Sequence, residues 1–411
     1  MACFQAFRCI HPATGLEADI AALPYDVYNR KEAGEAVKGR PHSFLRIDRA
    51  ETQFAEEIDI YDKRVYEKAR ELLWGMVEQG QFVEEQEPAY YVYELTMEGR
   101  SQTGIVGCAS IDDYVSGVIK KHENTRAEKE QDRICHVDTC KAQTGPVFLA
   151  YREDERITDV VEAVKAGEPM FDFVAEDGIR HRGWKIAGAP QIWVLSEAFY
   201  SLGGMYIADG HHRAASAVRV GLNRREEQPD YTGQEEFNYF LAVAFPDAQL
   251  HIMDYNRVVK DLNGLREEEF LAKVGEKFEI EKVSGQMGPA HKGEFTMFLG
   301  EQWYYLKAKP EIMSEDPVDG LDVSVLQDAL LGPILGIGDP RRDTRIDFIG
   351  GIRGLQELER RVRTDMQVAF AMYPTSMKEL FDVADAGLLM PPKSTWFEPK
   401  LRSGLFIHAI G

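Results

Sequence analysis

The sequence predicts a mixed fold, α/β to α+β, because short strand-like apolar runs alternate with helical stretches along the whole chain. Two such runs, AYYVYEL at 89–95 and TGIVGCA at 103–109, are joined by a short polar link and predict a β-hairpin. Apolar residues at helical spacing within 56–79 predict a long amphipathic helix. Together these patterns argue against an all-α or an all-β chain.

Length and charge narrow the class of protein further. The chain has 411 residues, which favours two or three domains, and we expect three segments, 1–115, 116–260 and 261–411. Its 48 basic and 69 acidic residues give a net charge of 48 − 69 = −21, which argues against a nucleic-acid partner because it repels phosphate backbones. A small basic pocket can still bind one nucleotide, since ionic screening limits the reach of the net charge.

The sequence also carries information on compartment. No apolar run approaches the roughly 20 residues that a membrane span needs, and the N-terminus lacks the apolar core of a secretory signal. The five cysteines are scattered and odd in number, which is typical of a reducing compartment. We therefore expect a cytoplasmic protein with no membrane partner, and the oligomeric state stays open.

Local patterns predict several further elements. Asn29 with Glu32, and Ser376 with Glu379, have the spacing of helix capping boxes, and the second helix is expected to end at Gly387. The apolar run at 144–151 predicts a buried strand, and 293–307 predicts a hairpin. The very polar stretch 118–134 predicts a loop that enters an exposed helix.

The middle of the chain gives the clearest pattern. QIWVL at 191–195 and MYIA at 205–208 are apolar runs that predict strands. After the second run the chain turns at Asp209-Gly210 and enters a helix, HHRAASAVRV, which we expect Gly221 to close. NYFLAVAF at 238–245 predicts another strand.

The strongest candidate site is this strand-turn-helix segment, YIADGHHRAASA. A helix N-terminus binds anions through its free N–H groups and its dipole, so acidic residues are expected in the first turn on local grounds. This helix instead begins with His211, His212 and Arg213, three potential cations. The alternative is that Asp209 is a plain N-cap and the histidines cover a surface. Three consecutive departures from the local rule favour an anion site, with Gly210 allowing close backbone approach.

Other residues are weaker candidates. His122 and Glu123 offer a general base and its partner, although such a polar segment is more often a solvated face. Arg133 and Asp26 are possible substrate contacts, and Asp26 could equally be a turn residue. MPPKSTWFEPK offers Lys393, Ser394 and Thr395 for a phosphate, but it lacks glycines, so a rigid packing loop is the stronger interpretation.

These motifs, taken in order, carry a resemblance. PYDV, KKHENT with the later DR, YIADGHHR and MPPKSTWFEPKLRSGL resemble, over nearly the whole chain, a family of uncharacterised bacterial and archaeal proteins. Its members are labelled SpoOJ/ParA/ParB/RepB-like or simply as a conserved domain of unknown function. The DGHHR segment is also similar to the phosphate-binding box of the ParB/sulfiredoxin-like fold, whose members include CTP-binding partition proteins, sulfiredoxin and a kinase that phosphorylates free serine with ADP.

The resemblance implies a ParB/sulfiredoxin-like core with additional α+β segments. It implies that Asp209, Gly210, His211, His212 and Arg213 cradle the phosphates of a nucleotide such as ADP, ATP or CTP. We expect a nucleotide-binding protein that acts as a kinase on a small hydroxylated metabolite. In that reaction Glu123 or His122 would accept the hydroxyl proton, and Asp209, Asp26 or Glu123 could hold Mg²⁺. The alternative is a non-catalytic, nucleotide-responsive binding protein of the ParB type.

Overall fold

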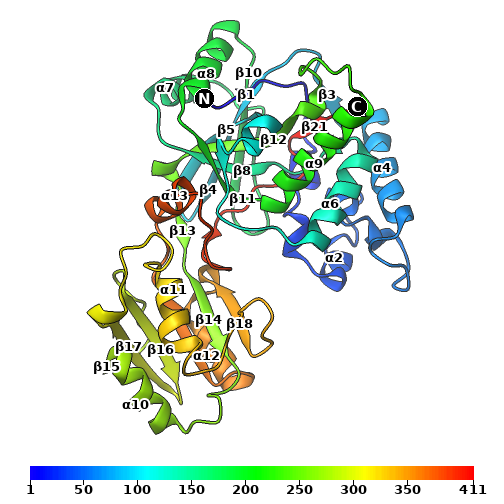
Figure 1. The fold of residues 1–411 in the computed structure, drawn as a ribbon. Coiled ribbons are helices and arrows are strands. Elements are labelled where there is room, and N and C mark those ends of the chain that lie inside the picture. The colour runs from blue at the N-terminus through cyan, green and yellow to red at the C-terminus, as the bar shows by residue number, and fades with distance from the viewer. The chain divides into compact units, whose positions relative to one another are not determined.

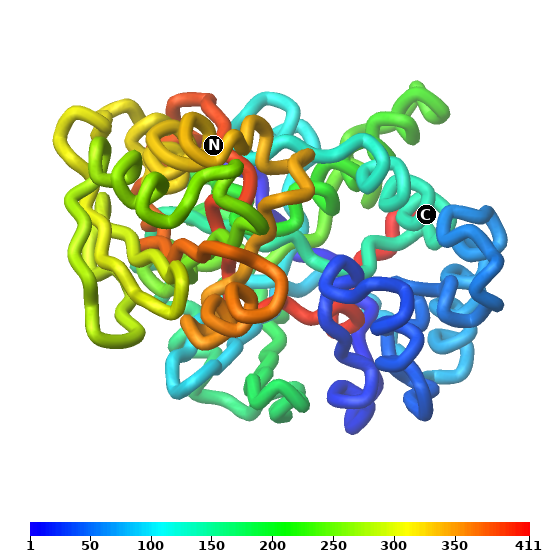
Figure 2. Tube along the Cα trace, turned by 90° about the horizontal axis from the view of Figure 1, so that it is seen from below, coloured from blue at the N-terminus to red at the C-terminus, as the bar shows by residue number.

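The structure, a computed structural model, describes residues 1–411. The chain forms two compact units: unit 1 is Met1–Leu250 with Pro399–Gly411, and unit 2 is His251–Glu398. The C-terminal segment returns to unit 1, where a strand near the C-terminus pairs with one near the N-terminus, and Figure 2 shows red and blue segments together there. The three segments expected from the sequence do not coincide with these units, and their independence as domains stays a prediction.

Unit 1 is built on a nine-stranded mixed sheet with the strand order β6-β11-β8-β12-β5-β4-β10-β9, and β1 also pairs with β5. A second sheet of the same unit has the order β3-β2-β21-β7. The strands are β1 (Phe4–Gln5), β2 (Cys9–Pro12), β3 (Phe82–Glu84), β4 (Tyr90–Met97), β5 (Arg100–Ser110), β6 (Ile119–Lys120), β7 (Ala142–Gln143), β8 (Val147–Tyr151), β9 (Phe171–Val174), β10 (Arg180–Ile186), β11 (Met205–Asp209), β12 (Tyr239–Pro246) and β21 (Ile407–Ala409). The helices are α1 (Glu17–Ile20), α2 (Arg30–Ala36), α3 (Leu45–Asp48), α4 (Lys63–Glu78), α5 (Ile111–Val115), α6 (Ala127–Cys140), α7 (Glu155–Lys165), α8 (Ala189–Ser201) and α9 (His211–Glu227).

The core of unit 1 lies between this large sheet and its helices. All eight residues of β12 are buried, as expected for a central strand covered on both faces, and this explains why the strand reads as a continuous apolar run. The predicted hairpin forms between β4 and β5. Helices α6 and α9 pack against each other, and Figure 1 shows them side by side. The alanines at 214, 215 and 217 are buried, which lets α9 lie close to the sheet.

Unit 2 has a six-stranded antiparallel sheet with the order β15-β17-β16-β19-β14-β18 and a short pair, β13-β20. Its strands are β13 (Ile252–Met253), β14 (Tyr255–Val259), β15 (Phe278–Val283), β16 (Glu294–Leu299), β17 (Gln302–Ala308), β18 (Ile346–Gly350), β19 (Val368–Met372) and β20 (Trp396–Phe397). Its helices are α10 (Glu267–Lys277), α11 (Asp322–Leu326), α12 (Gly354–Thr364) and α13 (Met377–Asp385). The hairpin expected at 293–307 is the β16–β17 pair.

Most of the local predictions hold, but some are wrong. QIWVL does not form a strand, because it lies inside α8, which begins after Gly188 with Pro190 in its first turn. A short apolar run fits a buried helix as well as a strand, and the proline placement was the available signal for a helix. The helix expected over 56–79 begins later, at Lys63, where Asp62 caps it.

Two further corrections concern α6 and α9. Gly221 does not end α9, which continues to Glu227. The glycine serves packing instead, since a Cβ there would lie 2.4 Å from the carbonyl oxygen of Phe237. The helix expected to be exposed within 118–134 is α6, which buries Arg133 and His136. The mixed α+β class is confirmed, while a ParB/sulfiredoxin-like core is not shown by this architecture.

Candidate functional site

The turn between β11 and α9 depends on Gly210. This residue has φ +92°, a left-handed conformation that side chains other than glycine rarely adopt. A Cβ at this position would also lie 3.0 Å from Nε of Arg213, so the guanidinium packs directly over the glycine. The register of β11 against β8 shifts just before the turn, between Ile207 and Asp209. Both the backbone and the close approach of Arg213 therefore require glycine.

The first turn of α9 has no side-chain cap. The first hydrogen bond of the helix runs from the N–H of Ala214 to the carbonyl oxygen of Gly210 at 2.9 Å. The N–H groups of the three preceding residues, His211 to Arg213, come before that bond and point out of the helix end. Asp209 is not the N-cap, since its Oδ1 accepts from the N–H of Gly210 at 2.9 Å. The start of α9 thus keeps the donors that an anion can use.

Two cations converge on the Asp209 carboxylate beside this helix end. The Oδ2 atom of Asp209 lies 3.6 Å from Nη2 of Arg213 and 3.4 Å from Nζ of Lys400. Burial alone would raise the pKa of Asp209, but the opposing interactions, led by Lys400 and Arg213, together hold that pKa well below its usual value. Arg213 also donates to the carbonyl oxygen of Pro146. Two cations therefore lie beside this carboxylate at the start of α9.

The two histidines of the first turn are not cations. His211 is buried, and its ring packs edge-on against His122 with centroids 4.6 Å apart. Burial, with a smaller effect of His122, lowers the pKa of His211 well below its usual value. Nε2 of His212 accepts a hydrogen bond from the N–H of Arg126 at 2.9 Å, and burial lowers its pKa too. The expected cationic triplet therefore contains one cation, Arg213.

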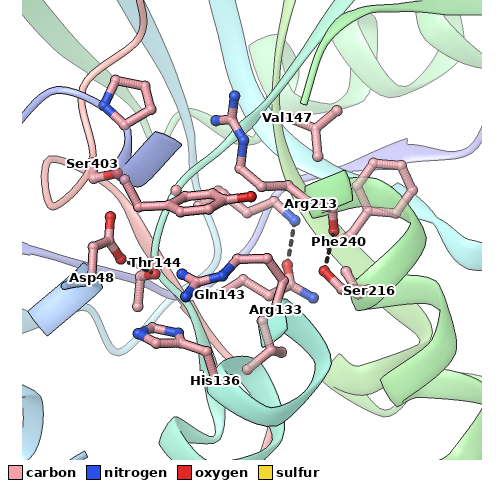
Figure 3. Close-up of a pocket in the computed structure, with 16 residues that line it drawn as sticks. Asp48, Arg133, His136, Gln143, Thr144, Val147, Arg213, Ser216, Phe240 and Ser403 are labelled. Atoms are coloured by element: carbon pink, nitrogen blue, oxygen red, sulfur yellow. Dashed lines mark hydrogen bonds between the residues drawn. The ribbon is translucent and has the colours of Figure 1, made fainter. Parts of the chain in front are cut away.

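Arg133 is a buried cation that lines the same cavity as Arg213. Both arginines line a narrow cavity of about 30 Å³, and Figure 3 shows their side chains around it with Asp48 and Thr144. The guanidinium of Arg133 lies 4.0 Å from the ring centroid of Tyr25, and its Nη2 lies 2.7 Å from Oδ2 of Asp132. Burial would lower the pKa of Arg133, but Asp132, Tyr25 and Asp48 together outweigh burial and raise it. Arg133 is thus permanently charged.

The other candidates of unit 1 differ in accessibility. His122 is buried, and burial lowers its pKa to about 4, so it is neutral near pH 7. Glu123 is exposed in the loop between β6 and α6. This loop is joined to α9 by the hydrogen bond from Arg126 to His212. Asp26 is exposed and lines a second cavity, to which Arg133 also contributes.

Lys393, Ser394 and Thr395 belong to unit 2, whereas the turn at Gly210 belongs to unit 1. The hydroxyl of Ser394 donates to the carbonyl oxygen of Pro391 at 2.6 Å, and Arg257 donates to the carbonyl oxygen of Lys393 at 2.9 Å. These bonds fit the packing-loop interpretation. Lys400, which the sequence analysis did not single out, is part of the same quoted motif, but it follows the point where the chain returns to unit 1.

A metal ion held by the protein alone does not fit these residues. No group of three His, Cys, Asp or Glu side chains lies close enough to form a metal site. Asp209, the expected Mg²⁺ ligand, already faces two cations that a metal ion would have to displace. Mg²⁺ usually enters with substrate phosphates and only one or two carboxylates. The expected role of Mg²⁺ therefore stays a prediction.

Residues 4–324, more than half of the chain, match the family described as "Protein of unknown function (DUF1015)". The chain belongs to this family. The resemblance to a ParB-like or SpoOJ-like family is therefore wrong, since the DUF1015 family is the one that matches. A comparison with curated proteins gives no match.

Several solved structures align with this DUF1015 chain at low similarity. A free serine kinase in complex with AMP is 15% identical, with a TM-score of 0.34, over 72% of this chain and 86% of that chain. SbnI with a C-terminal truncation, from Staphylococcus aureus, is 12% identical, with a TM-score of 0.38, over 71% and 82%. A conserved hypothetical protein from Pyrococcus furiosus is 15% identical, with a TM-score of 0.34, over 73% and 93%. Scores at this level do not establish a shared fold or function.

None of the helices combines the length and the apolar character that crossing a bilayer demands.

Proposed function

We propose that unit 1 binds the phosphates of a nucleotide at the N-terminus of α9 and transfers a phosphoryl group to a small hydroxylated metabolite. The observation that carries this proposal is the convergence of an uncapped helix start, the Arg213 guanidinium and the Lys400 ammonium on one point. Each of these three features favours an anion. Together they match a phosphate, which has several acceptor oxygens and more than one negative charge.

The distances at Asp209 support an exchangeable contact. A tight charge-assisted hydrogen bond spans about 2.7–2.9 Å, whereas the contacts of Arg213 and Lys400 with Asp209 span 3.6 and 3.4 Å. Contacts of this length are looser than a direct charge-assisted hydrogen bond, so a phosphate can compete with Asp209 for both cations. A phosphate at the helix end would then accept from both cations and from the free N–H groups of α9.

The chemistry needs little more than positioning. The acceptor hydroxyl oxygen attacks the terminal phosphorus, the bond from that phosphorus to the bridging oxygen breaks, and the hydroxyl proton passes to a base. We assign the base to Glu123, because its loop adjoins α9 through Arg126 and its side chain is exposed. His122 is packed against His211 and would position that ring rather than touch substrate. ADP, ATP and CTP share the diphosphate that this site would hold.

Calorimetric titration with ADP tests the binding step. Arg213→Ala or Lys400→Ala removes one charged partner, which is worth about 1.5–3 kcal/mol and corresponds to roughly 10- to 100-fold weaker binding. Arg219→Ala is the matched control, because Arg219 is an exposed arginine of the same helix. Equal ADP affinity in Arg213→Ala and Arg219→Ala would contradict the proposal. Repeating the titration with Mg²⁺ tests the expected metal.

Phosphorus NMR tests the transfer step. The protein is incubated with a nucleotide and hydroxylated metabolites, and the spectrum is followed for a new phosphate ester. We expect Glu123→Gln to slow ester formation while ADP binding persists. Binding of ADP without any ester would reduce the proposal to nucleotide binding alone.

A further inference from the structure

A second cavity of unit 1, of about 150 Å³, adjoins Arg133 of the candidate site. It lies between the loop at Tyr25, the helices α4 and α6, and the residues that follow α3. Tyr25, Asp48, Arg133 and His136 line both this cavity and the narrow one beside Arg213. A molecule in the larger cavity would therefore lie next to the residues that adjoin the start of α9.

The lining of this cavity is rich in carboxylates. Asp26, Asp48, Glu51 and Asp132 contribute four, against the three cations Arg49, Lys129 and Arg133. Two of the cations are already engaged. Arg49 donates to Oε1 of Glu51 at 2.6 Å and to the carbonyl oxygen of Tyr25 at 3.0 Å. Arg133 donates to Oδ2 of Asp132 at 2.8 Å.

Two buried carboxylates keep one oxygen without a hydrogen-bond partner. Asp48 is 5% exposed, and its Oδ1 accepts from the hydroxyl of Thr144 at 2.8 Å, while its Oδ2 accepts from no residue. Glu51 is 4% exposed, and only its Oε1 is engaged, by Arg49. Neither oxygen is fully buried, so each is open to solvent or to a ligand. Both residues line the cavity, so a ligand placed there can supply the missing donors.

The chemistry of that donor follows from the lining. An ammonium group has three N–H donors and a positive charge, which suits two acceptor oxygens in an acidic cavity. Tyrosine rings at Tyr25, Tyr61 and Tyr66 add aromatic walls, and such walls also favour cations. The cavity volume is only about 150 Å³, so the ligand is small.

We infer that this cavity binds a small hydroxylated amine, whose ammonium contacts Asp48 and Glu51 and whose hydroxyl faces Arg133. This inference names the acceptor class and rests on the proposed function. The ammonium can belong to an amino alcohol or to an amino acid. A polyol or a hydroxy acid of equal size lacks the cation and is excluded by the acidic lining.

Calorimetry without nucleotide tests this inference independently of phosphate binding. The probes are ethanolamine and serine as amines, glycerol as a polyol and glycolate as a hydroxy acid. We expect at least one amine to bind, with glycerol and glycolate at least tenfold weaker. If serine binds tenfold tighter than ethanolamine, the amine also carries a carboxylate; the reverse order assigns an amino alcohol. Binding of glycolate or glycerol as tight as that of both amines, or no binding by either amine, would overturn the inference.

Variants locate the ammonium. Glu51→Gln and Asp48→Asn each keep the shape of the side chain and remove its charge, and each should weaken amine binding at least tenfold. Glu78→Gln, an exposed acid of α4, is the matched control. If both cavity variants bind the amine as tightly as Glu78→Gln does, the site lies elsewhere and the inference fails. If amines bind in this cavity but Arg213→Ala leaves the ADP affinity unchanged, the proposed function fails and the amine site stands.

Discussion

The helices α9 in unit 1 and α13 in unit 2 treat the unbonded N–H groups of their first turns in opposite ways. In α13 the hydroxyl of Ser376 accepts from the N–H of Glu379 at 3.2 Å, and the Glu379 carboxylate accepts from the N–H of Ser376 at 2.8 Å. An acid thus lies in its first turn, where the helix dipole favours it. In α9 there is no cap and no acid in the first turn. A helix end whose own residues satisfy its donors has a structural role, whereas α9 leaves its donors available for a ligand.

The two units also differ in their buried titratable groups. Unit 1 buries neutral histidines, and burial lowers the pKa of His122 from 6.5 to about 4. Unit 2 buries Asp322, whose carboxylate accepts from the N–H of Gly293 at 2.9 Å. Burial raises the pKa of Asp322 from 3.8 to about 7. These shifts have opposite consequences for stability, because one group resists gaining a proton and the other resists losing one.

The largest predicted effect is this opposite pH dependence. For Asp322 the unfolded state releases its proton first, so unit 2 loses about 4 kcal/mol as pH rises from 3.8 to about 7. For His122 the unfolded state binds its proton first, so unit 1 loses about 3 kcal/mol as pH falls from 6.5 to about 4. Denaturant titrations of Asp322→Asn and His122→Gln across this range check both signs. Parallel pH profiles for wild type and both variants would contradict the burial argument.

A smaller effect separates two glycines with positive φ. Gly210→Ala meets both an unfavourable φ of +92° and the Arg213 guanidinium, so we expect a loss of about 1–3 kcal/mol in unfolding free energy and weaker ADP binding. Gly387→Ala, after α13, has φ +68° and nothing within 4 Å of its Cβ. It should cost only about 1 kcal/mol, with no change in ADP binding. If Gly210→Ala and Gly387→Ala lose the same stability and both still bind ADP normally, then the position of Arg213 does not depend on a glycine at 210.

The smallest effect concerns the cap itself. Ser376→Ala removes the side-chain acceptor at the start of α13 and should cost about 1 kcal/mol of unfolding free energy. ADP affinity should not change, because this helix end holds no ligand. Chemical denaturation and calorimetry on the same preparation measure both quantities. A weaker affinity for ADP in this variant would contradict the purely structural role of the start of α13.

Local patterns could be predicted from the sequence, and contacts between distant segments could not. The capping boxes at Asn29 and Ser376 form as expected, since each depends on residues three positions apart. The glycine turn before α9 was also predicted from local residues. The neutral state of His211 was not, because it depends on burial and on His122, which is far away in the sequence. Lys400 was missed for the same reason: it reaches Asp209 only because the chain returns to unit 1.

The central claim is that the start of α9 holds phosphate, and a crystal structure of the protein grown with ADP tests it most directly. The account predicts a phosphate group within hydrogen-bond distance of the N–H groups of His212 and Arg213. Both the Arg213 guanidinium and the Lys400 ammonium should have turned from Asp209 toward that phosphate. ADP bound at another place, with both cations still on Asp209, would contradict the claim.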